Sequence, residues 1–159
     1  KQIKKYSELD NFPLAVDGCS APVPFMPLYN IALMYQKLAS GDYEELNILY
    51  DAMVTNPMQV GGTDRFDTDF ILALNGRAVT KVGGEAIQGV SVRAKDGAAW
   101  GIAVKILDGS HRCGPTATLA ILKNLDLVNS SELEKLDKYY NIILRNHNKL
   151  DVGSIIIDI

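Results

Sequence analysis

The chain has 159 residues, of which 47% are hydrophobic, 22% charged and 8% aromatic, and its formal net charge is -3. This composition is typical of one folded domain and excludes a collagen, a disordered tail and a disulfide-rich scaffold. The longest apolar run, near Ile155 to Ile157, is too short to cross a bilayer. No basic stripe with interleaved aromatic residues is present, so we expect no nucleic-acid and no membrane partner.

The N-terminal part divides into a polar end and an apolar strand. The first residue is Lys1 rather than Met, which predicts a processed, trimmed or partial chain. Residues 1–12 are polar, and we expect a peripheral segment there. Pro13 to Val16 is apolar and meets the Gly- and Pro-punctuated segment 17–22, which predicts a strand followed by a tight turn. We expect residues 13–159 to form a single domain.

Three helices are predicted next. Apolar residues recur at helical spacing over 27–39. A second stripe, Leu46 to Val54, follows Asp42 and Glu45, whose spacing resembles a capping box. Thr63 is placed to cap a third helix that ends at an Asn-Gly pair.

The period then changes to two, which predicts an antiparallel sheet. Ala78 to Gly83 is typical of a strand. Two alternating segments, 90–93 and 100–106, are joined by the turn signal Lys95-Asp96-Gly97 and predict a hairpin. The remaining predicted elements are a helix from Gly114, a short helix capped by Ser131 and Glu134, and a strand over 152–159. The fold class is therefore α+β, with an antiparallel sheet flanked by helices.

The first segment with chemical potential is Asp17-Gly18-Cys19. A carboxylate and a thiol two residues apart on a tight turn can face one pocket, and a thiolate can attack or bind metal. The alternative is a structural cysteine. Cys19 and Cys113 show no disulfide spacing and are expected to be reduced, as in a cytosolic protein. No further ligand has zinc spacing, so a complete zinc site is not predicted within this chain.

The second segment is the strand that carries Lys81. This lysine lies between β-branched residues and is followed by Gly83 and Gly84. It can provide the positive charge that binds a substrate or stabilises an oxyanion. Lys-Val-Gly also resembles the Lys-Thr-Gly strand element of serine β-lactamases. The alternative is a lysine that protects an edge strand from aggregation.

Two further segments are less specific. Gly61-Gly62 precedes a helix, and its backbone amides could bind an anion. However, the carboxylates of Asp64 and Asp67 already interact with the positive end of the helix dipole. The alternative there is capping together with an Arg65 salt bridge. His111 and Cys113 are two residues apart, and we expect a surface loop.

The sequence contains no self-sufficient nucleophile motif. Ser-x-x-Lys, Gly-x-Ser-x-Gly, His-Glu-x-x-His and Gly-x-x-x-x-Gly-Lys-Ser/Thr are all absent from it.

Several motifs in order nevertheless resemble one family. These are Val-Asp-Gly-Cys-Ser-Ala-Pro (16–22), the helix 27–39, Val-Gly-Gly-Thr-Asp-Arg-Phe-Asp-Thr (60–68), Thr-Lys-Val-Gly-Gly-Glu (80–85) and Gly-Ile-Ala-Val-Lys-Ile-Leu-Asp-Gly (101–109). From about Leu14 onward the chain resembles the C-terminal half of the asparaginase II family, the thermolabile or rhizobial-type L-asparaginases.

The resemblance implies hydrolysis of L-asparagine to L-aspartate and ammonia on a serine-β-lactamase-like fold. In that family the Ser-x-x-Lys nucleophile motif and a Cys-x-x-Lys metal motif lie in an N-terminal half. We therefore expect that this N-terminal half is the partner of the chain and that the isolated chain is inactive. We also expect a cytoplasmic protein, and a homodimer is compatible with the resemblance. The alternatives are another β-lactamase-like serine hydrolase or peptidase, and a non-catalytic amino-acid-binding module.

The resemblance also implies roles for single residues. Cys19 would be a ligand of zinc, Asp17 would contact the substrate, and Lys81 would be the active-site cation. Arg65, Asp67 and Thr68 match the Arg-x-Asp-Thr motif of the family. The resemblance implies that they lie on the substrate side of the site.

Overall fold

A three-stranded antiparallel sheet lies at the centre of the computed structural model, which describes residues 1–159. Its strands are β3 (Ala78–Gly83), β4 (Ile87–Arg93) and β5 (Ala99–Lys105), in that spatial order. Gly97 lies between β4 and β5 with a φ of 89° that suits glycine. The predicted strand and hairpin are thus confirmed, and β3 and β5 are the two edges of the sheet.

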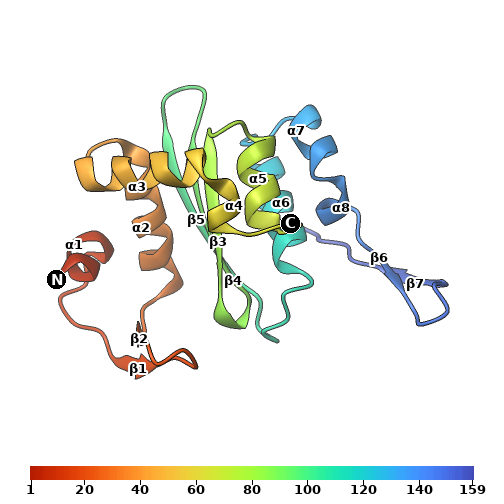
Figure 1. Cartoon of the computed structure of the whole chain (residues 1–159), viewed down its shortest axis with the longest axis horizontal. Helices are drawn as coiled ribbons and strands as arrows, with labels where there is room; N and C mark the ends of the chain where they lie inside the picture. Colours follow the sequence, from red (N-terminus) through yellow and green to blue (C-terminus); the bar gives the residue numbers. More distant parts are fainter.

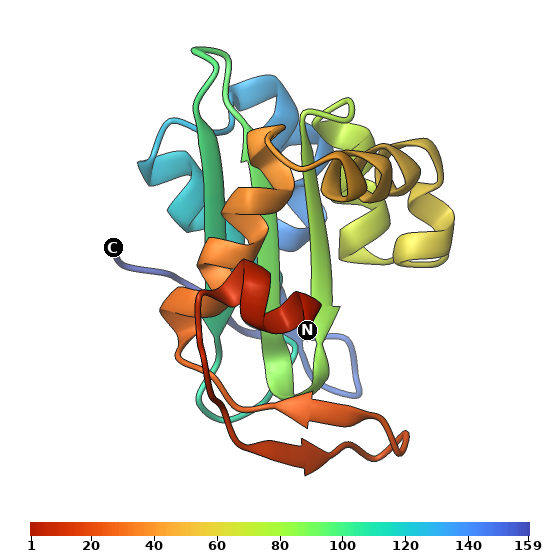
Figure 2. The ribbon, with the colours of Figure 1, turned by 90° about the vertical axis from the view of Figure 1, so that its left-hand side faces the viewer.

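The two faces of the sheet differ in side-chain size and carry different helices (Figure 1). The face under helix α2 (Leu28–Ser40) presents small residues, and Figure 2 shows α2 lying along it. The opposite face presents Val90, Val92 and Val104 to α5 (Phe66–Ala73) and α6 (Gly114–Asn124), where the main hydrophobic core forms. Strand alternation therefore assigns one face to close helix packing and the other to the core.

The remaining elements surround this sandwich. On the α2 side lie α1 (Gln2–Ser7) and α3 (Glu44–Thr55), and α4 (Pro57–Val60) lies between α3 and α5. On the α6 side lie α7 (Ser130–Lys135) and α8 (Asp137–Tyr140). The smaller elements are the hairpin of β1 (Leu14–Val16) and β2 (Pro22–Pro24), the 3-10 turn η1 (Gly84–Ala86), and the hairpin of β6 (Ile143–Arg145) and β7 (Asp151–Ser154). These elements confirm the α+β class, with small antiparallel sheets and helices. No helix is both long and apolar enough to cross a membrane.

The helix starts differ from those predicted. α3 begins after Tyr43 without a side-chain cap, because Glu45 instead accepts hydrogen bonds from Lys5 and Tyr6 of α1. The predicted Asp42–Glu45 capping box is therefore wrong.

The caps of two later helices also differ. α5 starts after Arg65 rather than at Thr63. α7 has a capping box between Asn129 and Glu132, two residues before the predicted pair. Several neighbouring polar residues satisfy the same cap pattern, so tertiary contacts decide between them.

At both ends of the chain the structure differs from the prediction that we made from the polarity of the residues. Residues 1–12 contain α1, where Tyr6 is buried and the Ser7 carbonyl accepts a hydrogen bond from Asn30. The predicted final strand over 152–159 is shorter, because only residues 151–154 pair with β6.

Candidate functional site

A buried carboxylate, Asp67, lies at the edge of the sheet. It belongs to the first turn of α5, where the helix dipole stabilises a negative charge. Its side chain is only 3% exposed. One oxygen, Oδ2, accepts a 3.0 Å hydrogen bond from the Val82 amide, which points away from the sheet. Asp67 therefore satisfies a backbone donor of an edge strand, a group that sheets otherwise leave open.

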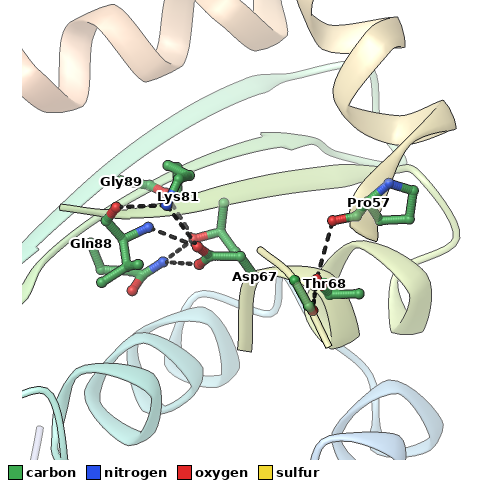
Figure 3. Close-up of polar contacts among 9 residues, drawn as sticks. Pro57, Asp67, Thr68, Lys81, Gln88 and Gly89 are labelled. Atoms are coloured by element: carbon green, nitrogen blue, oxygen red, sulfur yellow. Dashed lines mark hydrogen bonds and ion pairs between the residues drawn. The ribbon is translucent and has the colours of Figure 1, made fainter. Parts of the chain in front are cut away.

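The predicted cation, Lys81, lies beside this carboxylate. Its Nζ is 3.5 Å from Asp67 Oδ2 and donates a 3.0 Å hydrogen bond to the Val82 carbonyl (Figure 3). The Lys81 side chain is 46% exposed, in contrast to its partner. The structure thus brings together two residues that are 14 positions apart in the sequence, and it leaves the ammonium accessible to a ligand.

Gln88 fixes the orientation of Asp67 from the neighbouring strand. Gln88 Nε2 donates to Asp67 Oδ1 at 2.7 Å and to Thr80 Oγ1 at 2.6 Å. The Thr80 hydroxyl donates in turn to the Gly89 carbonyl at 2.8 Å. All these side chains are buried. The network is therefore a connected set of hydrogen bonds that holds the carboxylate in one position.

Thr68, the third residue of the predicted Arg-x-Asp-Thr motif, makes different contacts. Its hydroxyl lies 2.7 Å from the Gly62 carbonyl and 3.1 Å from the Pro57 carbonyl (Figure 3). Gly61 packs against the same turn, because an added Cβ would lie 2.6 Å from Thr68 Oγ1. Thr68 thereby attaches the loop before α5 to the helix.

Asp67 and Lys81 contribute to two different pockets. A pocket of about 200 Å³ contains Asp67 together with exposed Arg65, whose side chain makes no hydrogen bond or salt bridge. A more apolar pocket of about 440 Å³ contains Lys81 and Tyr35 on the α2 side of the sheet. The ion pair between Asp67 and Lys81 therefore joins a residue of one pocket to a residue of the other at the edge of β3.

Two tyrosines next to these groups are neutral hydrogen-bonding side chains near neutral pH. Burial, together with the negative charge of Asp67, raises the pKa of Tyr35 to about 12. Burial and a hydrogen bond to Asp69 raise the pKa of Tyr139 to about 12. Tyr139 lines the smaller pocket and can therefore contribute polarity there without charge.

The turn with Asp17 and Cys19 is the exposed tip of the β1–β2 hairpin. Asp17 accepts a hydrogen bond from the Gly18 amide, and Cys19 Sγ lies 3.7 Å from Asp17 Oδ2. Figures 1 and 2 place this hairpin at the end of the sheet where β3 ends, but no hydrogen bond or ion pair connects it to Lys81 or Asp67. The structure therefore separates these two predicted residues from the Asp67 network.

The residues present do not form a zinc site by themselves. The turn offers one thiol and one carboxylate, and no cluster of three or more His, Cys, Asp or Glu side chains could hold a metal ion. Cys113 is also a free thiol, and exposed His111 lies in the loop before α6, as the sequence predicted. Cys19 as a metal ligand stays a prediction.

The sequence interpretation missed Gln88, Thr80 and Tyr139. Gln88 could have been noticed, because it is polar at a position that alternates with core-facing Val90 and Val92. Such a residue needs a buried hydrogen-bond partner. The partner itself was not predictable, since it lies 21 residues away on another element.

Comparison with known proteins identifies the family of the chain. The family model for L-asparaginase II matches residues 1–157, so the chain belongs to the L-asparaginase II family. Membership places it among the amidohydrolases of the L-asparaginase type. A comparison with curated proteins found no match.

Proposed function

We propose that the chain takes part in the hydrolysis of L-asparagine to L-aspartate and ammonia, with Lys81 as the cation of the site. The observation that carries this proposal is the family match over residues 1–157, combined with an accessible lysine beside a buried carboxylate. The fold we propose is serine-β-lactamase-like, and the subtype is the thermolabile or rhizobial type. Helices on both faces of an antiparallel sheet support that fold.

The residues suit the chemistry of amide hydrolysis. When a nucleophile attacks the side-chain amide of asparagine, negative charge develops on the carbonyl oxygen before the C–N bond breaks and ammonia leaves. The Lys81 ammonium can stabilise this charge, and Asp67 orients the ammonium through the 3.5 Å contact between Lys81 Nζ and Asp67 Oδ2. Arg65 and Asp17 carry charges suited to the α-carboxylate and α-ammonium of the amino acid. No step of this proposal uses zinc.

The nucleophile is proposed to come from a Ser-x-x-Lys segment, because these 159 residues contain none. We therefore expect the purified chain alone to release no ammonia from L-asparagine. Ammonia release by the chain alone would contradict this and would require a nucleophile within it.

The test of Lys81 uses an active enzyme that carries these residues together with that segment. We expect Lys81→Ala to lower kcat for L-asparagine by about a hundredfold or more, the effect of losing one electrostatic stabiliser. Lys95→Ala is the matched control, because Lys95 is exposed in the β4–β5 turn without a side-chain hydrogen bond or ion pair. Equal rates for both variants, measured by ammonia release, would refute the role of Lys81.

A further inference from the structure

The larger of the two pockets lies among α2, α3 and the edge strand β3. Its volume of about 440 Å³ is within the range of about 300–1,000 Å³ that is usual for small-molecule sites. Most of its lining is hydrophobic and comes from α2 and α3. The aliphatic and thioether side chains that form this lining are Met34, Leu38, Leu46, Leu49, Met53 and Val60.

Lys81 is the only charged residue that lines this pocket. Its ammonium has three N–H donors, of which one faces Asp67 Oδ2 at 3.5 Å and one the Val82 carbonyl at 3.0 Å. The third donor has no partner in the protein, and the side chain is half-exposed. No acidic side chain lines the pocket. The pocket therefore presents a single positive charge to a ligand, with a donor to spare.

The Tyr35 hydroxyl is a second donor beside Lys81. Lys81 and Gly89 are directly opposite each other on β3 and β4, so their side-chain positions share one face of the sheet. Tyr35 fills the space that Gly89 leaves, because an added Cβ there would lie 2.6 Å from the Tyr35 hydroxyl oxygen. Burial raises the pKa of Tyr35 to about 12, so the hydroxyl keeps its proton. It has no hydrogen-bond partner in the protein and can donate to a ligand.

The chemistry of the lining selects an amphiphile with one charged end. A carboxylate can accept hydrogen bonds from the lysine and the tyrosine together. A second charge on the ligand would lie against apolar side chains, which costs free energy. The unbranched side chains of Met34 and Met53 adapt to the shape of a flexible apolar chain.

From this arrangement we infer that the larger pocket binds a monocarboxylate with a medium-length apolar chain. The carboxylate accepts hydrogen bonds from the Lys81 ammonium and the Tyr35 hydroxyl, and the apolar chain lies along α2 and α3. This ligand class goes beyond the amino acid of the proposed function, and its binding does not depend on that function. The two ligands share the Lys81 ammonium, so the monocarboxylate competes with L-asparagine in an active enzyme.

The direct test measures binding of octanoate to the 159-residue chain by calorimetry. Octan-1-ol has the same chain without the charge, and butyrate has the same charge on a shorter chain. We expect each to bind about tenfold or more weakly than octanoate, since one loses a charged hydrogen bond and the other apolar contact. Equal affinities for octanoate and either analogue, or no binding of octanoate at millimolar concentration, would overturn the inference.

One variant tests the charged end of the pocket. Lys81→Gln should weaken octanoate by about tenfold and leave octan-1-ol unchanged. Lys95→Gln is the matched control, because Lys95 is exposed in the β4–β5 turn and does not line this pocket. An unchanged octanoate affinity in Lys81→Gln would show that the carboxylate does not lie at Lys81.

A second variant tests the apolar end. Leu49→Glu places a charge among the apolar side chains and should weaken octanoate and octan-1-ol alike. Leu49 is 49% exposed, so the fold should accept this change. Ile48→Glu is its control, because Ile48 is the neighbouring exposed residue of α3 and does not line the pocket. Equal effects of the two variants would count against a ligand along α3.

The four methionines of the chain locate the bound molecule. Met34 and Met53 line the pocket, whereas Met26 and Met58 do not. In NMR spectra of methionine methyl groups, octanoate should shift the signals of Met34 and Met53. Shifts confined to Met26 and Met58 would overturn the inference, even if calorimetry detected binding.

An active enzyme that carries these residues separates this inference from the proposed function. Octanoate should raise KM for L-asparagine and leave kcat unchanged. Shifts at Met34 and Met53 without any inhibition would keep the pocket and refute the proposed role of Lys81 in hydrolysis. Loss of turnover in Lys81→Ala, with no binding of octanoate to the unaltered enzyme, would keep the proposed function and overturn the pocket.

Discussion

Asp67 receives three donors, and this number determines how it can be replaced. The Val82 amide, the Gln88 carboxamide and the Lys81 ammonium all point to its two oxygens. A carboxylate has acceptor sites for all of them, whereas an amide has one oxygen and a nitrogen that donates. Asp67 is therefore specified by its surroundings as a carboxylate and not merely as a polar residue.

Asp67→Asn is expected to destabilise the chain by about 1–3 kcal/mol, because its NH₂ group must face at least one donor in a buried site. The change is isosteric, so packing is preserved. The urea midpoint should fall with an unchanged m-value. Asp64→Asn is the control: Asp64 is exposed, makes no side-chain hydrogen bond or ion pair, and has a φ of 55° that asparagine tolerates. Equal midpoints for the two variants would show that the Asp67 charge is not needed.

The same residues show how far a sequence predicts a site. Lys81 and Asp67 were identifiable because each stands in a motif, next to glycines or at a helix start. The motif did not distinguish Asp67 from Thr68, which uses its hydroxyl on two backbone carbonyls. That difference depends on which side of α5 faces the sheet, a tertiary property. Gln88 carries no motif and is recognised only once its strand register is known.

At the scale of elements, two glycines determine how α2 lies on the sheet. An added Cβ at Gly101 would lie 2.0 Å from the Ala32 carbonyl oxygen, and one at Gly89 would lie 2.0 Å from the Tyr35 ring. The helix backbone therefore touches β5 directly. Alternation in the sequence predicted both strands, but it did not predict that the small-residue face would receive a helix, because small residues also occur on exposed faces.

Gly101→Ala should destabilise the chain by about 1–3 kcal/mol, the usual cost of forcing an extra carbon into a packed contact. The clash is with helix backbone, which cannot rotate away as a side chain can. Gly84→Ala is the control, because nothing lies within 4 Å of its added Cβ. Thermal unfolding followed by circular dichroism measures both. A midpoint for Gly101→Ala at or above that of Gly84→Ala would contradict the close packing of α2 on β5.

At the scale of the whole molecule, the core and the projecting hairpin differ in their contacts. The core joins residues of α5, α6 and the sheet, whereas the β1–β2 hairpin extends beyond the sheet (Figure 2). Leu14 and Val16 on β1 are 63% and 76% exposed, and Phe25 and Tyr29, between the end of the hairpin and the start of α2, are 62% and 73% exposed. Contiguous apolar surface is usually covered in a working protein.

The chain is accordingly expected to self-associate through the hairpin. Sedimentation should show an average mass that rises with concentration, and the double variant Leu14→Lys, Val16→Lys should remain monomeric at the same concentrations. Because both side chains are exposed, the substitutions should change the unfolding midpoint little. Ile48→Lys is the control, since Ile48 is 66% exposed but lies on α3, which Figure 2 shows away from the hairpin. A monomeric parent chain at all concentrations, or equal suppression by Ile48→Lys, would show that the hairpin surface does not drive association.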